Sequence, residues 1–197
     1  LNLPIENVDH IMEWVIHKAK HYADQNESMG FNYYDQKLAE KRIGRQFHIS
    51  RIFNSIKECD TIREISEDPR LWEIASKYIG NIPKLFGVHF RWSYPVDASY
   101  IDQDKKLAQV FHTDIDDYKF IKFFFYLTDV DEYSGPHEFV LKSHLRKKIK
   151  HQMSLKRISD LDILNTYGKE NIKTIYGKSG NGFAGDTYCF HIFYFIF

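Results

Sequence analysis

The sequence predicts an α+β protein in which N-terminal helices support a mainly β core. Apolar residues recur at helical spacing through most of residues 1–82, whereas from residue 83 onward the segments alternate with the period of a strand. The 16 Phe and 13 Tyr favour strands and concentrate in the second half. A length of 197 residues suits a single domain, 1–197, with helical support over 1–82 and the β core over 83–197.

Four helices are predicted in the first eighty residues. Residues 5–25 carry an amphipathic apolar stripe, and a short charged helix is expected around 36–42. Residues 46–58 also place apolar side chains at roughly helical intervals, which favours a third helix. The fourth helix, 69–80, has Asp68 as its cap, Pro69 in its first turn and Gly80 as its stop.

The second half is predicted to form strands that are interrupted by one helix. The helix is expected at 157–168, with Ser159 or Asp160 near its start. Since no internal repeat is present, this order predicts helices in front of one antiparallel β-domain. The strands are expected at 84–95, 107–113, 119–128, 137–142, 171–177 and 182–197.

Composition excludes some partners and points to a compartment. Lys plus Arg and Asp plus Glu both number 27, and no long block of one sign appears, so nucleic acid is not expected as a partner. Cys59 and Cys189 lie far apart and outside any CxxC pair, as reduced cytosolic thiols would. The first residues lack the pattern of a signal peptide, and no segment approaches membrane-spanning length. A soluble, cytoplasmic protein with no membrane partner is expected.

The candidate functional residues begin with an HxD pair in a strand-like segment. His112 and Asp114 flank Thr113, and strand residues two apart project from the same face. An isolated pair of this kind more often consists of surface neighbours. If His191 were brought in from a distant strand, the three side chains would form a 2-His-1-carboxylate facial triad, which leaves three octahedral positions open on a ferrous ion.

Three segments in fixed order add a family resemblance. They are HTD at 112–114, FFFYLTDVDEYSGPHEFVLKSH at 123–144 and GDTYCFH at 185–191. Over residues 88–191 the chain resembles the phytanoyl-CoA dioxygenase (PhyH) family of Fe(II)- and 2-oxoglutarate-dependent oxygenases. The resemblance implies a double-stranded β-helix, which is a jelly-roll and cupin-like fold. It also implies Fe(II) held by His112, Asp114 and His191, 2-oxoglutarate as co-substrate, and dioxygen with a small-molecule substrate that is hydroxylated.

The residues expected to bind the co-substrate are less directly marked. Gln109 matches a position that contacts the oxo acid in some relatives. Arg91 is expected either to face the pocket as an anion partner or to stack at the surface beside Trp92. In the family a basic residue on the strand after the distal histidine holds the far carboxylate, but this chain ends six residues after His191. The C-terminal strand is therefore expected to be incomplete, with Lys122 or Lys142 as possible substitutes.

Two alternatives to the dioxygenase stay open. One is a truncated or non-catalytic member of the same fold that binds metal without turnover. The other is a cupin-like metal protein with isomerase or storage chemistry, which predicts more than two histidines on facing strands. A halogenase is disfavoured, because Asp114 is present where those enzymes carry a small residue.

Overall fold

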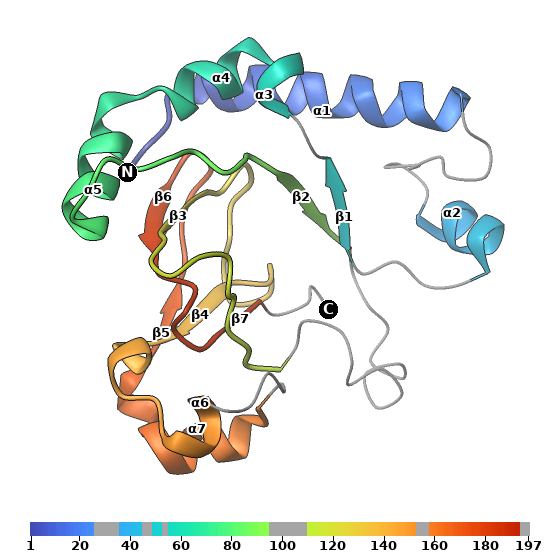
Figure 1. Cartoon of the computed structure of the whole chain (residues 1–197). Helices are drawn as coiled ribbons and strands as arrows, with labels where there is room; N and C mark the ends of the chain where they lie inside the picture. The colour runs from blue at the N-terminus through green and yellow to red at the C-terminus, as the bar shows by residue number, and fades with distance from the viewer. Residues whose placement is uncertain (26–35, 45–48, 53–54, 95–109, 153–157, 194–197) are drawn as a thin grey trace.

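The computed structural model describes residues 1–25, 36–44, 49–52, 55–94, 110–152 and 158–193. Its mixture of helices and antiparallel sheets belongs to the α+β class, as predicted. Helices α1, α3, α4 and α5 lie along one side of the molecule, and α6 and α7 lie at the opposite end, with the second-half strands between them (Figure 1). The helices are α1 (Ile5–Gln25), α2 (Gln36–Ile43), α3 (Ser55–Glu58), α4 (Asp60–Ser66), α5 (Pro69–Ile79), α6 (Ile149–Gln152) and α7 (Asp160–Tyr167).

Three predicted helices are confirmed, and two of them, α5 and α7, have the end signals that the sequence predicts. Helix α1 covers the predicted range and buries Val8, Ile11 and Val15. In α5 the Asp68 carboxylate accepts a hydrogen bond from a backbone N–H of the first turn, and Gly80 ends the helix in the left-handed conformation at φ 81°. The Ser159 hydroxyl caps α7 in the same way. These predictions are confirmed because each signal acts within one helical turn.

The helix predicted over 46–58 is wrong for its central part. Residues Ile49–Ile52 form strand β1, which pairs antiparallel with β2 (Phe90–Ser93). A helix follows at Ser55–Glu58 as α3. Ile52 and Ile56 do reach the same hydrophobic cluster, as the spacing suggested, but they reach it from a strand and from a helix. The backbone hydrogen bonds supplied by β2 override the local helical pattern.

The strands form three small antiparallel sheets. β1 pairs with β2, β3 (Lys122–Phe125) pairs with β6 (Gly182–Gly185), and the third sheet has the order β5-β4-β7. Its members are β4 (His137–Val140), β5 (Ile172–Ile175) and β7 (His191–Phe193). Among the described residues these strands do not close into a barrel.

Two predicted strands are interrupted. The strand expected at 182–197 breaks after Gly185, because the Asp186 carboxylate accepts from the backbone N–H of Tyr188 at 2.8 Å and the Asp186 carbonyl accepts from Cys189 at 3.0 Å. These bonds form a turn between β6 and β7. Within the described part of 107–113, pairing is limited to isolated bridges at Phe111 and His112.

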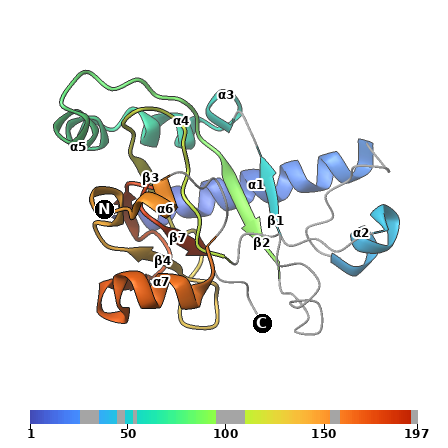
Figure 2. The same ribbon diagram turned by 60° about the horizontal axis from the view of Figure 1, so that its bottom comes forward.

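Two hydrophobic clusters hold these layers together. The first joins α1 and α4 to β2, with Ile11, Val15, Ile62 and Phe90 among its buried members. Leu127 packs against this cluster. The second joins α7 to the three-stranded sheet through Ile163, Val140 and Ile192, all fully buried; the packing of α7 beside this sheet is visible in Figure 2.

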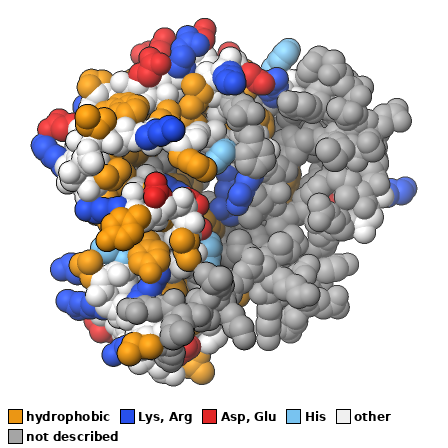
Figure 3. All heavy atoms as spheres, viewed as in Figure 1, with side chains coloured by type: hydrophobic (Ala, Val, Ile, Leu, Met, Phe, Trp, Pro, Cys, Tyr) orange, Lys and Arg blue, Asp and Glu red, His pale blue; other side chains and the backbone are white. Residues whose placement is uncertain are grey.

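The described surface mixes charge types. Acidic, basic and hydrophobic side chains alternate over the described part of the face in Figure 3. None of the described helices combines the length and the apolar character needed to cross a membrane.

Candidate metal centre

The backbone brings the predicted metal-binding residues together. The N–H of His112 donates to the carbonyl of His191 at 3.1 Å, and the N–H of His191 donates back at 3.0 Å. The N–H of Asp114 donates to the carbonyl of Thr187 at 2.8 Å. Residues paired directly across antiparallel chains project from the same face, and so does a residue two positions farther along. His112, Asp114 and His191 therefore converge although the third is distant in sequence.

The three side chains are close enough to share one ion. One possible ligand atom from each lies within 4.8 Å of the others. Nε2 of His191 is 3.7 Å from Oδ2 of Asp114, and the two imidazole ring centres are 4.3 Å apart. Metal bonds to imidazole nitrogen and carboxylate oxygen are about 2.0–2.2 Å long, so one ion between these atoms can reach both. Two nitrogens and one oxygen are ligands that divalent transition metals take in proteins.

Backbone carbonyls set the tautomer of both histidines. Nδ1 of His112 lies 3.1 Å from the carbonyl oxygen of Val110, and Nδ1 of His191 lies 3.1 Å from that of Cys189. A carbonyl can only accept, so each Nδ1 carries the hydrogen and each Nε2 keeps its lone pair for a metal. Such outer hydrogen bonds orient ligating imidazoles. In each case the acceptor is the backbone carbonyl of the residue two positions before the histidine.

Burial and charge keep the site in its ligating form. Burial lowers the pKa of His191 to about 4, with a further decrease from the charge of His112. The His191 imidazole is therefore neutral near pH 7. Burial by itself raises the pKa of Asp114, but the hydrogen bond from Lys122 and the positive charge of that lysine lower it, and the pKa lies below its ordinary value. The set thus includes a neutral imidazole at His191 and an ionised carboxylate at Asp114.

Lys122 is a cation that binds the carboxylate of this set. It lies at the start of β3, and its Nζ is 2.7 Å from Oδ2 of Asp114 and 2.6 Å from Oδ2 of Asp116. The Asp114 oxygen that faces His191 is therefore the one that binds the lysine. The sequence pattern named Lys122 only as a possible co-substrate anchor and did not identify the two aspartates as its partners.

An aromatic wall continues this inner face of β3. Phe124 stacks on Phe183 of β6, with ring centres 4.9 Å apart, and both contact the ring of His137. The Tyr126 hydroxyl donates to the carbonyl of Ile175 at 2.9 Å, so Nδ1 of His137, 3.1 Å away, must donate to that hydroxyl. Nε2 of His137 is then a buried acceptor with no partner among the described residues.

Arg91 faces inward from β2. Its guanidinium carbon lies 3.9 Å from the ring centre of Phe193, and its Nε is buried without a hydrogen-bond partner in the described part of the chain. Burial and the charge of Arg51 lower its pKa to about 10, whereas Asp114 acts in the opposite direction. The guanidinium remains charged at neutral pH, and it stacks on Phe193 near the candidate metal centre.

The remaining predicted site residues lie elsewhere. Gln109 falls outside the described residues. Lys142 is exposed, with a left-handed backbone at φ 59°. His144 contacts Sγ of Cys189 through Nδ1 at 2.9 Å.

Comparison with known proteins adds no assignment. No model of a known protein family matches this sequence, and no curated protein matches it either.

Replacing Lys122 by methionine should tighten the binding of a divalent metal. Lys122 and the metal compete for the same Asp114 oxygen, and repulsion between one and two positive charges about 5 Å apart is roughly 1–2 kcal/mol in a water-like dielectric. We expect about a tenfold gain in affinity, measured by anaerobic Fe(II) titration against a competing chelator. Lys173→Met, at an exposed position of β5, serves as the control. Weaker binding by Lys122→Met would show instead that the lysine positions the carboxylate.

Proposed function

We propose that this chain is an Fe(II)- and 2-oxoglutarate-dependent dioxygenase that hydroxylates a small organic substrate. The convergence of His112, Asp114 and His191, with one possible ligand atom of each within 4.8 Å of the others, carries this proposal. Two imidazoles and one carboxylate on one face leave three positions of an octahedral ion open, enough for a bidentate oxo acid and dioxygen. Bound iron would supply the activation of dioxygen, which no side chain can provide.

The chain's own residues hold the site in a competent state. The carbonyls of Val110 and Cys189 keep Nε2 of both histidines as the ligating atom. Burial of His191 keeps its imidazole neutral, and Lys122 keeps Asp114 ionised. The rings of Phe124 and Phe193 contribute apolar surface at the same inner face. Such a surface excludes water from a reacting centre.

Arg91 is our choice for the residue that binds the far carboxylate of 2-oxoglutarate. It is charged, it lies close enough to Asp114 for the carboxylate to affect its pKa, and its buried Nε has no partner among the described residues. A buried guanidinium donor without a partner is costly, and a carboxylate would satisfy it with a charge-assisted hydrogen bond. Lys122, which already binds Asp114 and Asp116, is the weaker candidate.

We further propose a double-stranded β-helix as the complete architecture of the core. Three observations support two facing sheets around an aromatic interior: the antiparallel pairing β3-β6, the three-stranded sheet β5-β4-β7, and the bridge between His112 and His191, which extends the three-stranded sheet. The contact of Phe139 of β4 with Phe183 of β6 links the two sheets.

The alternatives make different use of the same residues. A non-catalytic member would use Lys122 as a permanent positive charge beside Asp114, where a metal would otherwise sit. The cupin-like alternative predicts more than two histidines at the metal centre. The cluster found among the described residues contains two.

The decisive experiment measures succinate formed from 2-oxoglutarate by anaerobically purified protein after Fe(II) and dioxygen are added together with a metabolite panel. We expect succinate only when all three are present. Its absence from the Fe(II)-loaded, folded protein with every panel member would contradict the proposal and favour a non-catalytic metal-binding protein.

Replacing Arg91 by methionine should weaken 2-oxoglutarate binding while leaving Fe(II) binding in place. A hydrogen bond to a charged group contributes about 1.5–3 kcal/mol, which corresponds to a loss of roughly 10- to 150-fold in affinity. The measurement is calorimetric titration of the Fe(II)-loaded protein without dioxygen. Arg51→Met, which removes the paired arginine of β1, is the matched control. Unchanged affinity in Arg91→Met would transfer the anchoring role to Lys122.

A further inference from the structure

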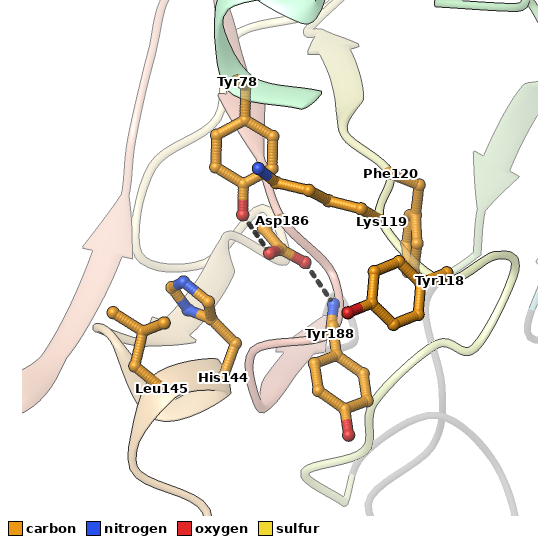
Figure 4. A pocket seen from close by; sticks show the side chains of 8 residues that line it. All are labelled: Tyr78, Tyr118, Lys119, Phe120, His144, Leu145, Asp186 and Tyr188. Carbon is orange, nitrogen blue, oxygen red and sulfur yellow. Dashed lines mark hydrogen bonds between the residues drawn. The ribbon is translucent and has the colours of Figure 1, made fainter. Parts of the chain in front are cut away.

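A cavity lies next to the turn between β6 and β7. Its volume is about 260 Å³, and it forms where this turn meets the C-terminal end of α5 and residues 118–120 (Figure 4). No member of the metal-binding triad lines it. Its walls are Tyr78, Tyr118, Lys119, Phe120, His144, Leu145, Asp186 and Tyr188.

A carboxylate is the anionic group of this pocket. Asp186 accepts hydrogen bonds from the hydroxyl of Tyr78 and from the backbone N–H of Tyr188, the latter at 2.8 Å (Figure 4). Burial, and then the bond to Asp186, raise the pKa of Tyr78, so the phenol remains a neutral donor. A carboxylate has about four acceptor sites, and these two bonds leave capacity for a ligand.

The aromatic part of the lining and the nearby helix end also favour positive charge. Four aromatic side chains, Tyr78, Tyr118, Phe120 and Tyr188, line the cavity, and the face of an aromatic ring attracts cations. Helix α5 ends beside the cavity, and the unpaired carbonyls at a helix C-terminus carry partial negative charge. Carboxylate, rings and helix end therefore act in the same direction.

Two lysine ammonium groups of the protein lie against tyrosine rings that line this cavity. Nζ of Lys119 lies 5.1 Å from the ring centre of Tyr78 and donates to the carbonyl of Ile79, at the end of α5, at 3.3 Å. Nζ of Lys147 lies 3.2 Å from the ring centre of Tyr188. Lys147 is buried, whereas Lys119 is exposed and can move into solvent without opening the core.

We propose that this pocket binds an organic ammonium group and that the ammonium of Lys119 occupies the same position when no ligand is bound. A primary or quaternary ammonium placed over Tyr78 and beside Asp186 would replace the lysine at the rings and at the helix end. The buried Lys147 stays in place on Tyr188. This site does not depend on the proposed dioxygenase activity, because it needs no metal.

Choline and its uncharged isostere 3,3-dimethylbutan-1-ol test this proposal, because they differ in charge and hardly in shape. Each compound is titrated into the metal-free full chain, and binding is monitored by the NMR shifts of the tyrosine rings. Choline should bind at least about tenfold more tightly than the uncharged isostere. Asp186→Asn should weaken choline binding by about tenfold or more, because it removes the anionic partner. Lys119→Met should strengthen it severalfold, because the competing ammonium is gone.

The matched control is Lys77→Met. It removes an exposed lysine of α5 that pairs with Glu73 outside the pocket. It should leave choline binding unchanged. Equal binding of the two isosteres, no binding of either, or weaker choline binding in Lys119→Met would each overturn the proposal. Binding of acetate that is lost in Lys119→Met would show an anion site instead. Lys119 is exposed, so this variant tests the proposal even if Asp186→Asn fails to fold.

Discussion

The His112→Ala variant is expected to lose stoichiometric Fe(II) binding. Iron of this kind exchanges readily, and the two ligands that remain, Asp114 and His191, cannot hold it at micromolar concentration. His112 is half-buried, so its truncation should leave the fold intact. The measurement is iron content after gel filtration of anaerobically loaded protein, with circular dichroism to confirm folding.

Two matched controls separate ligation from general damage. Asp114→Asn should lose iron, whereas Asp116→Asn should retain it, although both aspartates bind the same lysine, Lys122. His144→Ala removes a half-buried histidine that lies outside the cluster and should also retain iron. Full iron occupancy in His112→Ala would rule out the triad as the metal centre.

The metal-free protein is expected to lose folding stability as the pH falls from 6.5 to 4. Burial lowers the pKa of His191 to about 4 and lowers that of His137 well below its ordinary value. Above pH 6.5 both histidines are neutral in the folded and unfolded chain, and stability is highest. Below it, the unfolded chain binds protons that the folded chain excludes, so stability falls until the folded pKa is reached.

The expected loss from His191 is about 3 kcal/mol over this range, at roughly 1.4 kcal/mol per pH unit. His137 adds to it. Urea unfolding of metal-free protein at pH 7.5, 5.5 and 4.5 measures the effect, and His191→Asn should reduce the slope by close to one proton. His10→Asn, at an exposed position of α1, is the control. A flat profile between pH 6.5 and 4.5 would contradict the burial of both neutral rings.

Charge pairing at the candidate site shows what sequence patterns do not reveal. The HxD spacing identified His112 and Asp114, and the GDTYCFH segment identified His191; the structure brings all three together, while their role as ligands stays a prediction. Neither pattern identified Lys122 as the partner of Asp114, because no spacing rule links residue 114 to a strand that begins eight residues later. The sequence also gives no sign of the Nε2 of His137, which has no hydrogen-bond partner among the described residues, since such an atom is defined by what surrounds it in space.

The sequence alone determined the helices whose ends carry their own signals, and it determined the α+β class. Asp68 and Gly80 for α5, and Ser159 for α7, act through hydrogen bonds that span four residues or fewer, so they are readable from the chain itself. Tertiary structure decided the secondary structure of Ile49–Ile52. This segment has apolar residues at helical spacing but forms strand β1. Its partner β2 is distant in sequence, and only the folded chain supplies those backbone hydrogen bonds.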